Sequence, residues 1–527
     1  MIGAEDAGAG LLLLLLIIIA CVAAVVHFIR IPYTVALVVA GLALALLPNT
    51  PQLTVTPEVI LFLFLPILLF YGAYHLNVRD LRVTLKPVTL LALPGVVATA
   101  GLVGLALHVA AGLSWTSALL FGTIVAATDP VAVLSIFGEM GAPRRLSTIV
   151  TGESLFNDGT ALVFYGAVLG VATSSTLDAG ATVERFVIAV LGGLALGVAV
   201  GVVGTAIVKN IDNALLETVI TLIMAYGGFL LADRLGASGP LETVAAGIFL
   251  GVTSKSAMSA TTRLQSSATW EFLDFLANSL LFLIMGLSVR RLSEETLTRL
   301  GTGLLWPLGI AIVAVVLSRV LVVWGVGGLL KVTMDGFLRR WNVVLVWAGL
   351  RGAVALAAAL SLPLGLPDRD LLLTMTLGIV LFTLLVQGLT MRPLLTWLGV
   401  VRTDTSRREI DLAVGRLQVT QAAAREVGAL QETGALDPAV AKRLIAGYAA
   451  RREEIRQSLT VAYGGSATWE RREERAAARH LLQVQREAAR SAAAQGQIAE
   501  DTLGVLLKEI DQDLARVEQE IQADGEG

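Results

Sequence analysis

Three acidic and two basic side chains stand in stretches of the sequence that are otherwise apolar. The acids are Asp129, Glu153 and Asp158, and the bases are Arg319 and Arg351. An ionised side chain at the centre of a bilayer costs about 3 kcal/mol or more, so such residues mark functional sites or pair with one another. A carboxylate at that depth can bind a small cation or carry a proton.

Asp129 is followed directly by a proline, in the run Thr128-Asp129-Pro130-Val131. Because proline lacks an N–H and clashes with the preceding turn, a break or kink is expected here. Freed carbonyls beside a carboxylate are hard oxygen ligands, and broken helices of this kind build the ion sites of secondary transporters. A proline kink whose Asp129 is neutralised by an arginine is the alternative, and the residues alone do not separate the two.

The run from Gly152 to Gly159 supplies a second polar group. On a helix Ser154 and Asp158 lie about 40° apart and share a face, so a hydroxyl and a carboxylate can hold one cation. Glu153 diverges from Asp158 by about 140° and must face another helix, where it needs a counter-charge. Asn157 lies between the two faces and suits bracing of the broken segments better than carrying charge. Unrelated polar residues in a helix bundle are the alternative.

Arg319 and Arg351 can neutralise the charge of two of the three acids. Removing one member of a buried ion pair costs roughly 3–5 kcal/mol, so we interpret these arginines as structural. We predict that Glu153 and Asp129 are the paired acids and that Asp158 remains free to titrate. The sequence leaves open which acid pairs with which arginine.

The elements that must position these groups are membrane-spanning helices. Of the 527 residues 15% are charged and 55% hydrophobic, and the mean hydropathy is +0.77. Residues 403–527 hold 17 Lys/Arg and 21 Asp/Glu, which leaves 22 and 21 for residues 1–402. We therefore predict an all-α polytopic domain over 1–402 and a soluble helical tail over 403–527. A soluble enzyme, a nucleic-acid binder and a disulfide-stapled domain are excluded, the last because Cys21 is the single cysteine.

Thirteen apolar runs are long enough to approach the roughly 20 residues that a span requires. The first, Leu11–Phe28, follows acidic residues instead of a basic region, so we predict a retained span. The others are about 32–47, 57–76, 88–111, 115–138, 146–173, 185–208, 214–232, 239–254, 272–289, 302–330, 341–363 and 370–398. With the N-terminus outside, the inside connections carry about 12 basic residues and the outside ones about 6. This bias predicts an outside N-terminus and a cytoplasmic tail in the plasma (inner) membrane.

The tail mixes Ala, Leu, Glu and Arg, with opposite charges three or four residues apart. Within it Leu503, Leu506, Leu507, Ile510 and Leu514 repeat at helical spacing and form one apolar stripe. We expect a solvated helical domain that packs on itself or on a second copy, and a ligand-sensing role is the alternative.

Taken together, five motifs resemble the monovalent cation–proton antiporters of the NhaP/NHE branch, in family order over about residues 10–400. The matching stretches are Thr128–Val133, Gly152–Asp158, Phe275–Phe282, Gly349–Ala353 and Phe382–Thr390. The resemblance implies inverted repeats, about 13 helices in core and dimer domains, crossed broken helices at the centre, and a homodimer.

Carried over position by position, the resemblance implies that Asp158 binds the ion and exchanges the proton. Ser154 and the backbone near Thr128 would complete the shell of a Na⁺ ion, with Asn157 and Asp129 beside it. Asn157 in place of a second aspartate is the pattern of the electroneutral branch.

The implied function is exchange of Na⁺, or alternatively K⁺ or Li⁺, for H⁺ in a 1:1 ratio, with no cofactor and no catalytic residue. Relatives often place an acid where this chain has Tyr71, and that acid helps to hold the ion. A phenol is a weaker ligand, so the cation preference stays open. Two other classes are the alternatives: a cation channel gated by the tail, and an intramembrane aspartyl protease that would use Asp129 and Asp158, although no Gly-x-Gly-Asp motif surrounds these residues.

Overall fold

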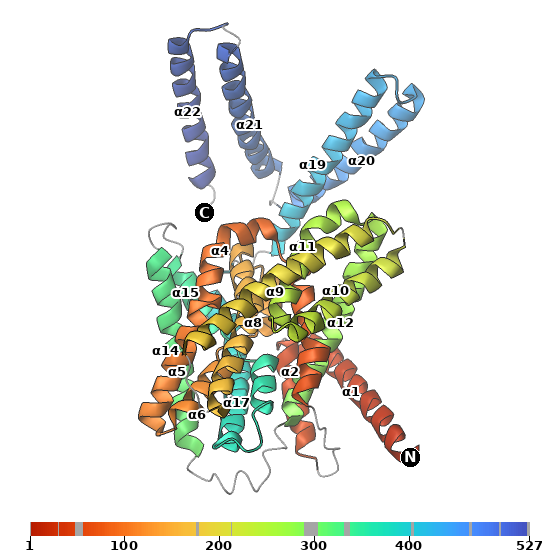
Figure 1. Cartoon of the computed structure of the whole chain (residues 1–527). Helices are drawn as coiled ribbons and strands as arrows, with labels where there is room; N and C mark the ends of the chain where they lie inside the picture. Colours follow the sequence, from red (N-terminus) through yellow and green to blue (C-terminus); the bar gives the residue numbers. More distant parts are fainter. Residues whose placement is uncertain are drawn as a thin grey trace. The chain divides into compact units, whose positions relative to one another are not determined.

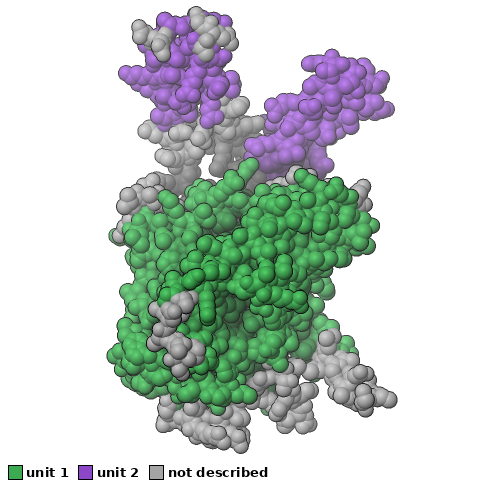
Figure 2. All heavy atoms as spheres, in the orientation of Figure 1, with its two compact units in different colours: residues 1–402 green, residues 403–527 purple. Residues whose placement is uncertain are grey.

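Within the residues that it describes, the computed structural model contains helices and no strands, as predicted (Figure 1). These are residues 2–29, 31–47, 56–174, 179–211, 213–288, 304–330, 338–401, 405–462, 466–494 and 497–523. The chain forms two compact units, 1–402 and 403–527 (Figure 2), and the boundary between them in the sequence lies where the charge content changes. Among the described residues, seven helices are individually long and apolar enough to cross a membrane.

Each of the thirteen predicted runs contains helix, and two of them are broken in the middle. The helices of the first unit before the second broken span are α1 (Ile2–Ile29), α2 (Tyr33–Ala45), η1 (Val59–Phe64), α3 (Leu65–Tyr74), α4 (Val78–Ala92), α5 (Pro94–Ala111), α6 (Trp115–Ile124), α7 (Val131–Met140), α8 (Arg144–Ser174), α9 (Ala179–Val208), α10 (Ala214–Arg234), α11 (Gly239–Ala257), α12 (Ala260–Leu287) and α14 (Leu305–Leu330). They are followed by α15 (Leu338–Trp347), α16 (Ala353–Leu360), α17 (Arg369–Phe382), η4 (Thr383–Gly388) and α18 (Leu389–Trp397).

The helices of the first unit sort into two layers by their contacts. The first, which we call the bundle, consists of α4–α8 and α14–α18, in which α5 packs against α6 and α14, and α8 packs against α4 and α6. The second, which we call the panel, consists of α1–α3 and α9–α12, in which α11 packs against α9, α10 and α3, and α12 packs against α2. The broken helices lie in the bundle.

The same packing pattern occurs twice in the chain. The first broken span, α6 and α7, is the fifth predicted run, and the second, α15 and α16, is the twelfth. With this offset α2 corresponds to α11 and α3 to α12, and the contact of α2 with α12 is mirrored by that of α11 with α3. An offset of seven spans reverses the direction in which a helix crosses the membrane, so the repeats are inverted.

Glycines set the distance between helices at these two crossings. A Cβ atom on Gly41 of α2 would collide with the backbone carbonyl of Leu283, and one on Gly286 of α12 would collide with the carbonyl of Val38. At the related crossing, a Cβ on Gly251 of α11 would collide with the carbonyl of Tyr74. Small residues allow such close approach of helices in a membrane. At these two crossings the helices therefore meet backbone to backbone.

The second unit consists of helical hairpins. The helices α19 (Thr405–Glu432) and α20 (Pro438–Ala462) pack against each other, as do α21 (Ser466–Ala494) and α22 (Glu500–Ala523). A small core in the first pair includes Ile455 and Leu459. The predicted stripe on α22 is half-buried at each of its positions, from Leu503 to Leu514, while the intervening residues are mostly exposed.

Candidate functional site

Two extended segments cross at the centre of the bundle. One joins the end of α6 at Ile124 to the start of α7 at Val131, and the other joins the end of α15 at Trp347 to the start of α16 at Ala353. The backbone N–H of Asp129 donates to the carbonyl of Leu350 at 2.9 Å, which ties the two segments together. The helix break predicted beside Pro130 is confirmed, and the second break, beside Arg351, completes the crossed broken helices that the family resemblance implies.

Asp129 lies at the start of both half-helices that follow the crossing. Its Oδ1 accepts a hydrogen bond from the N–H of Val131 at 3.0 Å, at the start of α7. A Cβ on Gly352, which precedes α16, would collide with the Asp129 carboxyl group. The N-terminus of a helix carries partial positive charge and stabilises a carboxylate. The Asp129 carboxylate is therefore placed to interact with the N-termini of α7 and α16 at the same time.

The prediction that Asp129 pairs with an arginine is wrong. Among the described residues it forms no ion pair, and the two helix N-termini supply the positive potential instead. The sequence held a signal for this role, since an Asp directly before a Pro is a typical helix start.

Glu153 forms the predicted buried ion pair, and its partner is Arg319. The guanidinium contacts both carboxylate oxygens, with an Nη2–Oε2 distance of 2.9 Å, and both side chains are more than nine-tenths buried. Arg319 also donates from Nε and Nη2 to the carbonyl of Leu345 at 3.1 and 3.0 Å. Because Leu345 lies near the C-terminus of α15, the arginine also stabilises the negative end of that half-helix.

Arg351 does not form the second ion pair that we predicted. Its side chain is 1% exposed, and its Nε and Nη1 have no hydrogen-bond partner among the described residues. It is close enough to Glu153 and Arg319 to interact with them electrostatically. Its backbone N–H donates to Oγ1 of Thr383 at 3.1 Å, which anchors the second extended segment to η4. Arg351 lacks a carboxylate partner because Asp129, the acid that we predicted to pair with an arginine, lies instead at the N-termini of α7 and α16.

Asn157 and Ser154 hold the first extended segment against α8. The backbone N–H of Thr128 donates to Oδ1 of Asn157 at 3.1 Å, and Nδ2 of Asn157 donates to Oγ1 of Thr128 at 2.8 Å. The hydroxyl of Ser154 donates to the carbonyl of Thr128 at 2.7 Å. The side chain of Asn157 thus uses both its acceptor and its donor on the broken segment, the bracing role that its position on the helix predicts.

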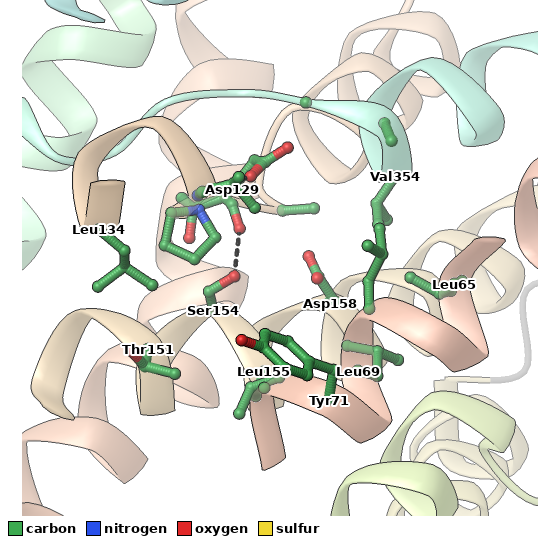
Figure 3. A pocket seen from close by; sticks show the side chains of 18 of the residues that line it. Leu65, Leu69, Tyr71, Asp129, Leu134, Thr151, Ser154, Leu155, Asp158 and Val354 are labelled. Carbon is green, nitrogen blue, oxygen red and sulfur yellow. Dashed lines mark hydrogen bonds between the residues drawn. The ribbon is translucent and has the colours of Figure 1, made fainter. Parts of the chain in front are cut away.

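Asp158 lines a cavity of about 370 Å³ between the bundle and the panel. Thr128, Asp129 and Ser154 line the same cavity, as does Tyr71 of α3 (Figure 3). The Asp158 side chain is 8% exposed and forms no hydrogen bond or ion pair with any described residue. A carboxylate, a hydroxyl and a backbone carbonyl thus converge on a space that is about ten times the volume of one water molecule. These are hard oxygen donors, which suit an alkali cation.

Three buried or cavity-lining acids were missed or misplaced from the sequence. The predicted run 272–289 places Asp274 near the end of a span, but α12 begins at Ala260, so Asp274 lies in the middle of the helix and lines the cavity. Polar residues between 261 and 271 concealed the first half of that helix. Glu242 and Glu217 are 0% and 1% exposed. Glu242 falls inside a run that we predicted to span, so its position alone could have identified it.

The comparisons with known proteins agree with this architecture. Residues 12–397 match the family model described as "Sodium/hydrogen exchanger, transmembrane". The Na⁺/H⁺ antiporter ApNhaP of Aphanothece halophytica is 38% identical over 396 residues, 74% of either chain. The Na⁺/H⁺ antiporter NhaP of Pseudomonas aeruginosa is 38% identical over 395 residues, 70% of this chain and 91% of its own length.

Among solved structures, the sodium proton antiporter MjNhaP1 of Methanocaldococcus jannaschii at pH 8 superposes with a TM-score of 0.63. It is 20% identical and covers 75% of this chain and 99% of its own, so the fold is shared. The family match and the two close relatives extend over the bundle, the panel and the crossed segments. The chain belongs to the transmembrane sodium/hydrogen exchanger family.

Proposed function

We propose that this protein exchanges a monovalent cation for H⁺ across a membrane, with Asp158 binding either one. The observation that carries the proposal is the isolation of this carboxylate. It lines a cavity, and no described base or hydrogen-bond donor contacts it, so its charge is left for a cation or a proton. The family match and the names of the relatives support the same reaction.

The cation we favour is Na⁺, with K⁺ and Li⁺ as alternatives. Its ligands would be the carboxylate of Asp158, the hydroxyl of Ser154 and the carbonyl of Thr128. The Ser154 hydroxyl donates its hydrogen bond to that carbonyl, so the lone pairs of its oxygen remain available to the ion. The cation is cargo, and the site requires no resident metal or cofactor.

A single free carboxylate also implies a 1:1, electroneutral exchange. Asp158 is neutralised by one proton or by one Na⁺, so the site crosses the membrane with the same charge in either form. The empty site would expose a bare carboxylate to low dielectric, which is costly. Exchange is thereby favoured over uncoupled leak, and rocking of the bundle against the panel would expose the cavity alternately to the two sides.

We place the protein in the plasma (inner) membrane as a homodimer, with the N-terminus outside and residues 403–527 in the cytoplasm, where the basic connections also lie. A protease is disfavoured, because Asp129 is held by two helix ends and cannot act as the partner of Asp158.

The proposal is tested by exchange in proteoliposomes loaded with a pH-sensitive dye. An imposed gradient of Na⁺ should drive protons in the opposite direction and saturate with concentration, and a voltage clamp by valinomycin and K⁺ should leave the rate of Na⁺ exchange unchanged. Comparison of Na⁺, Li⁺ and K⁺ gradients identifies the cargo. A sustained current that does not depend on proton movement would support a channel and contradict the proposal.

Asn157→Asp tests the link between one carboxylate and electroneutrality. The new acid would lie beside Asp158 and would lose the donor group that binds Thr128 Oγ1. We expect exchange to become sensitive to membrane voltage, since a second ionisable group now changes the charge that moves, or to be lost with the brace. Exchange at the original rate and blind to voltage would contradict the charge argument. Asn157→Ser, which adds no charge, is the control for loss of the brace.

A further inference from the structure

A further acidic side chain, Asp274, lines the cavity that contains Asp158. Asp274 reaches the cavity from α12 of the panel, opposite the helix that carries Asp158. Its Oδ1 accepts a hydrogen bond from Nδ2 of Asn278 at 3.0 Å, one turn along the same helix. No described base forms an ion pair with it. Its charge is therefore not cancelled by another residue of the described chain.

Asp274 belongs to a polar lane that follows α12 towards its N-terminus. Ser267, Glu271 and Asp274 are four and three residues apart, so they share one face of the helix. His75, at the end of α3, contacts Ser267 through Nε2 and Oγ at 3.0 Å. Glu271 and Asp274 are close enough to the phenol of Tyr71 to interact with it electrostatically. The lane thus runs from the ends of the panel helices to the cavity.

The inverted repeat relates the two helices that face each other across this lane. Tyr71 lies on α3 and Asp274 lies on α12, and these helices hold equivalent places in the two repeats. Both residues line the cavity. An acid on α3 would present a carboxylate to the cavity from one side, and Asp274 presents one from the repeat-related helix. The phenol at position 71 leaves that carboxylate without a like charge on α3 to repel it.

We propose that Asp274 is a second acidic group of the transport site, which draws the cation into the cavity and sets its apparent affinity. The inference rests on the proposed exchange at Asp158. Asp274 is a positioning residue: its field acts on the cation across the cavity, while Asp158 exchanges cation and proton. An extra negative charge on the wall of a cavity concentrates cations there.

The test is the concentration dependence of Na⁺-driven proton movement in proteoliposomes. For Asp274→Asn we expect the apparent KM for Na⁺ to rise about tenfold with little change in maximal rate. The electrostatic attraction between a carboxylate and a cation several Å apart near a protein surface is of the size that changes an affinity by about that factor. Asp274→Glu should keep the original KM. Glu271→Gln, on the same helix face but outside the cavity lining, is the matched control and should change KM far less.

A restoring variant separates a charge effect from a structural one. Tyr71→Glu in the Asp274→Asn background returns a carboxylate to the cavity from the repeat-related helix, so the KM should fall back towards that of the original protein. A merely structural Asp274 would not be rescued in this way, and an inactive double variant or an unchanged KM in Asp274→Asn would overturn the inference. Failure of the unsubstituted protein to exchange at all would overturn the proposed function instead, which is a different outcome.

Discussion

Replacing Asp158 with Asn is expected to reduce Na⁺-driven proton movement to the level of protein-free liposomes. The amide has nearly the shape of the acid but can neither release a proton nor neutralise a cation. Asp129 cannot take over, because it is committed to the N-termini of α7 and α16. The measurement is dye-reported proton flux after an imposed Na⁺ gradient, at several pH values.

Two controls keep this result specific to the site. Asp233→Asn removes an exposed carboxylate from α10, outside the cavity, and should leave flux unchanged. The thermal midpoint of purified Asp158→Asn protein in detergent should equal or exceed that of the original, since an unpaired buried charge has been removed. Full exchange by the variant would show that another group carries the proton.

Replacing Glu153 with Gln is expected to have the largest effect on stability. The carboxylate is 2% exposed and is held by Arg319, so its loss leaves a buried guanidinium without a counter-charge. Breaking a buried pair in this way costs about 3–5 kcal/mol. The measurement is reversible unfolding in mixtures of detergent and SDS, followed by tryptophan fluorescence.

The loss of stability in Glu153→Gln should arise from the unpaired charge of Arg319 and not from loss of packing. In Glu153→Gln/Arg319→Met the unpaired charge is gone, so the double variant should be more stable than either single one. Glu139→Gln is the matched control, because Glu139 pairs with Arg392 at a site where the two side chains are 53% and 29% exposed. Such a pair contributes at most about 1 kcal/mol. Equal losses at both pairs would contradict our assignment of a buried structural pair.

The broad architecture could be predicted because its signals are local. Apolar runs of the required length identify spans, and a proline after Asp129 or glycines around Arg351 interrupt them, whatever the rest of the chain does. The shared face of Ser154 and Asp158 also follows from helix geometry alone. These predictions depend on residues within one or two turns of each other.

The partners of the charged residues could not be predicted in the same way. Counting charges indicated two ion pairs, but of the three acids Asp129, Glu153 and Asp158 only Glu153 has a guanidinium partner among the described residues. Asp129 is stabilised by helix ends, which carry no residue label in a sequence. Asp274 was missed because the first half of α12 is polar, and its presence in the cavity depends on how the two repeats face each other.

The glycine contacts described above differ between the inside of the panel and its border with the bundle. Inside the panel, Gly41 and Gly251 press against backbone carbonyls, which cannot move without distorting a helix. At the border, Gly72 of α3 faces the side chain of Leu155, and Gly159 of α8 faces that of Leu241. A leucine can change rotamer at little cost. Sliding of α3 and α8 along this border would therefore meet adjustable leucine side chains at these two positions, and the cavity of Asp158 lies along the same border.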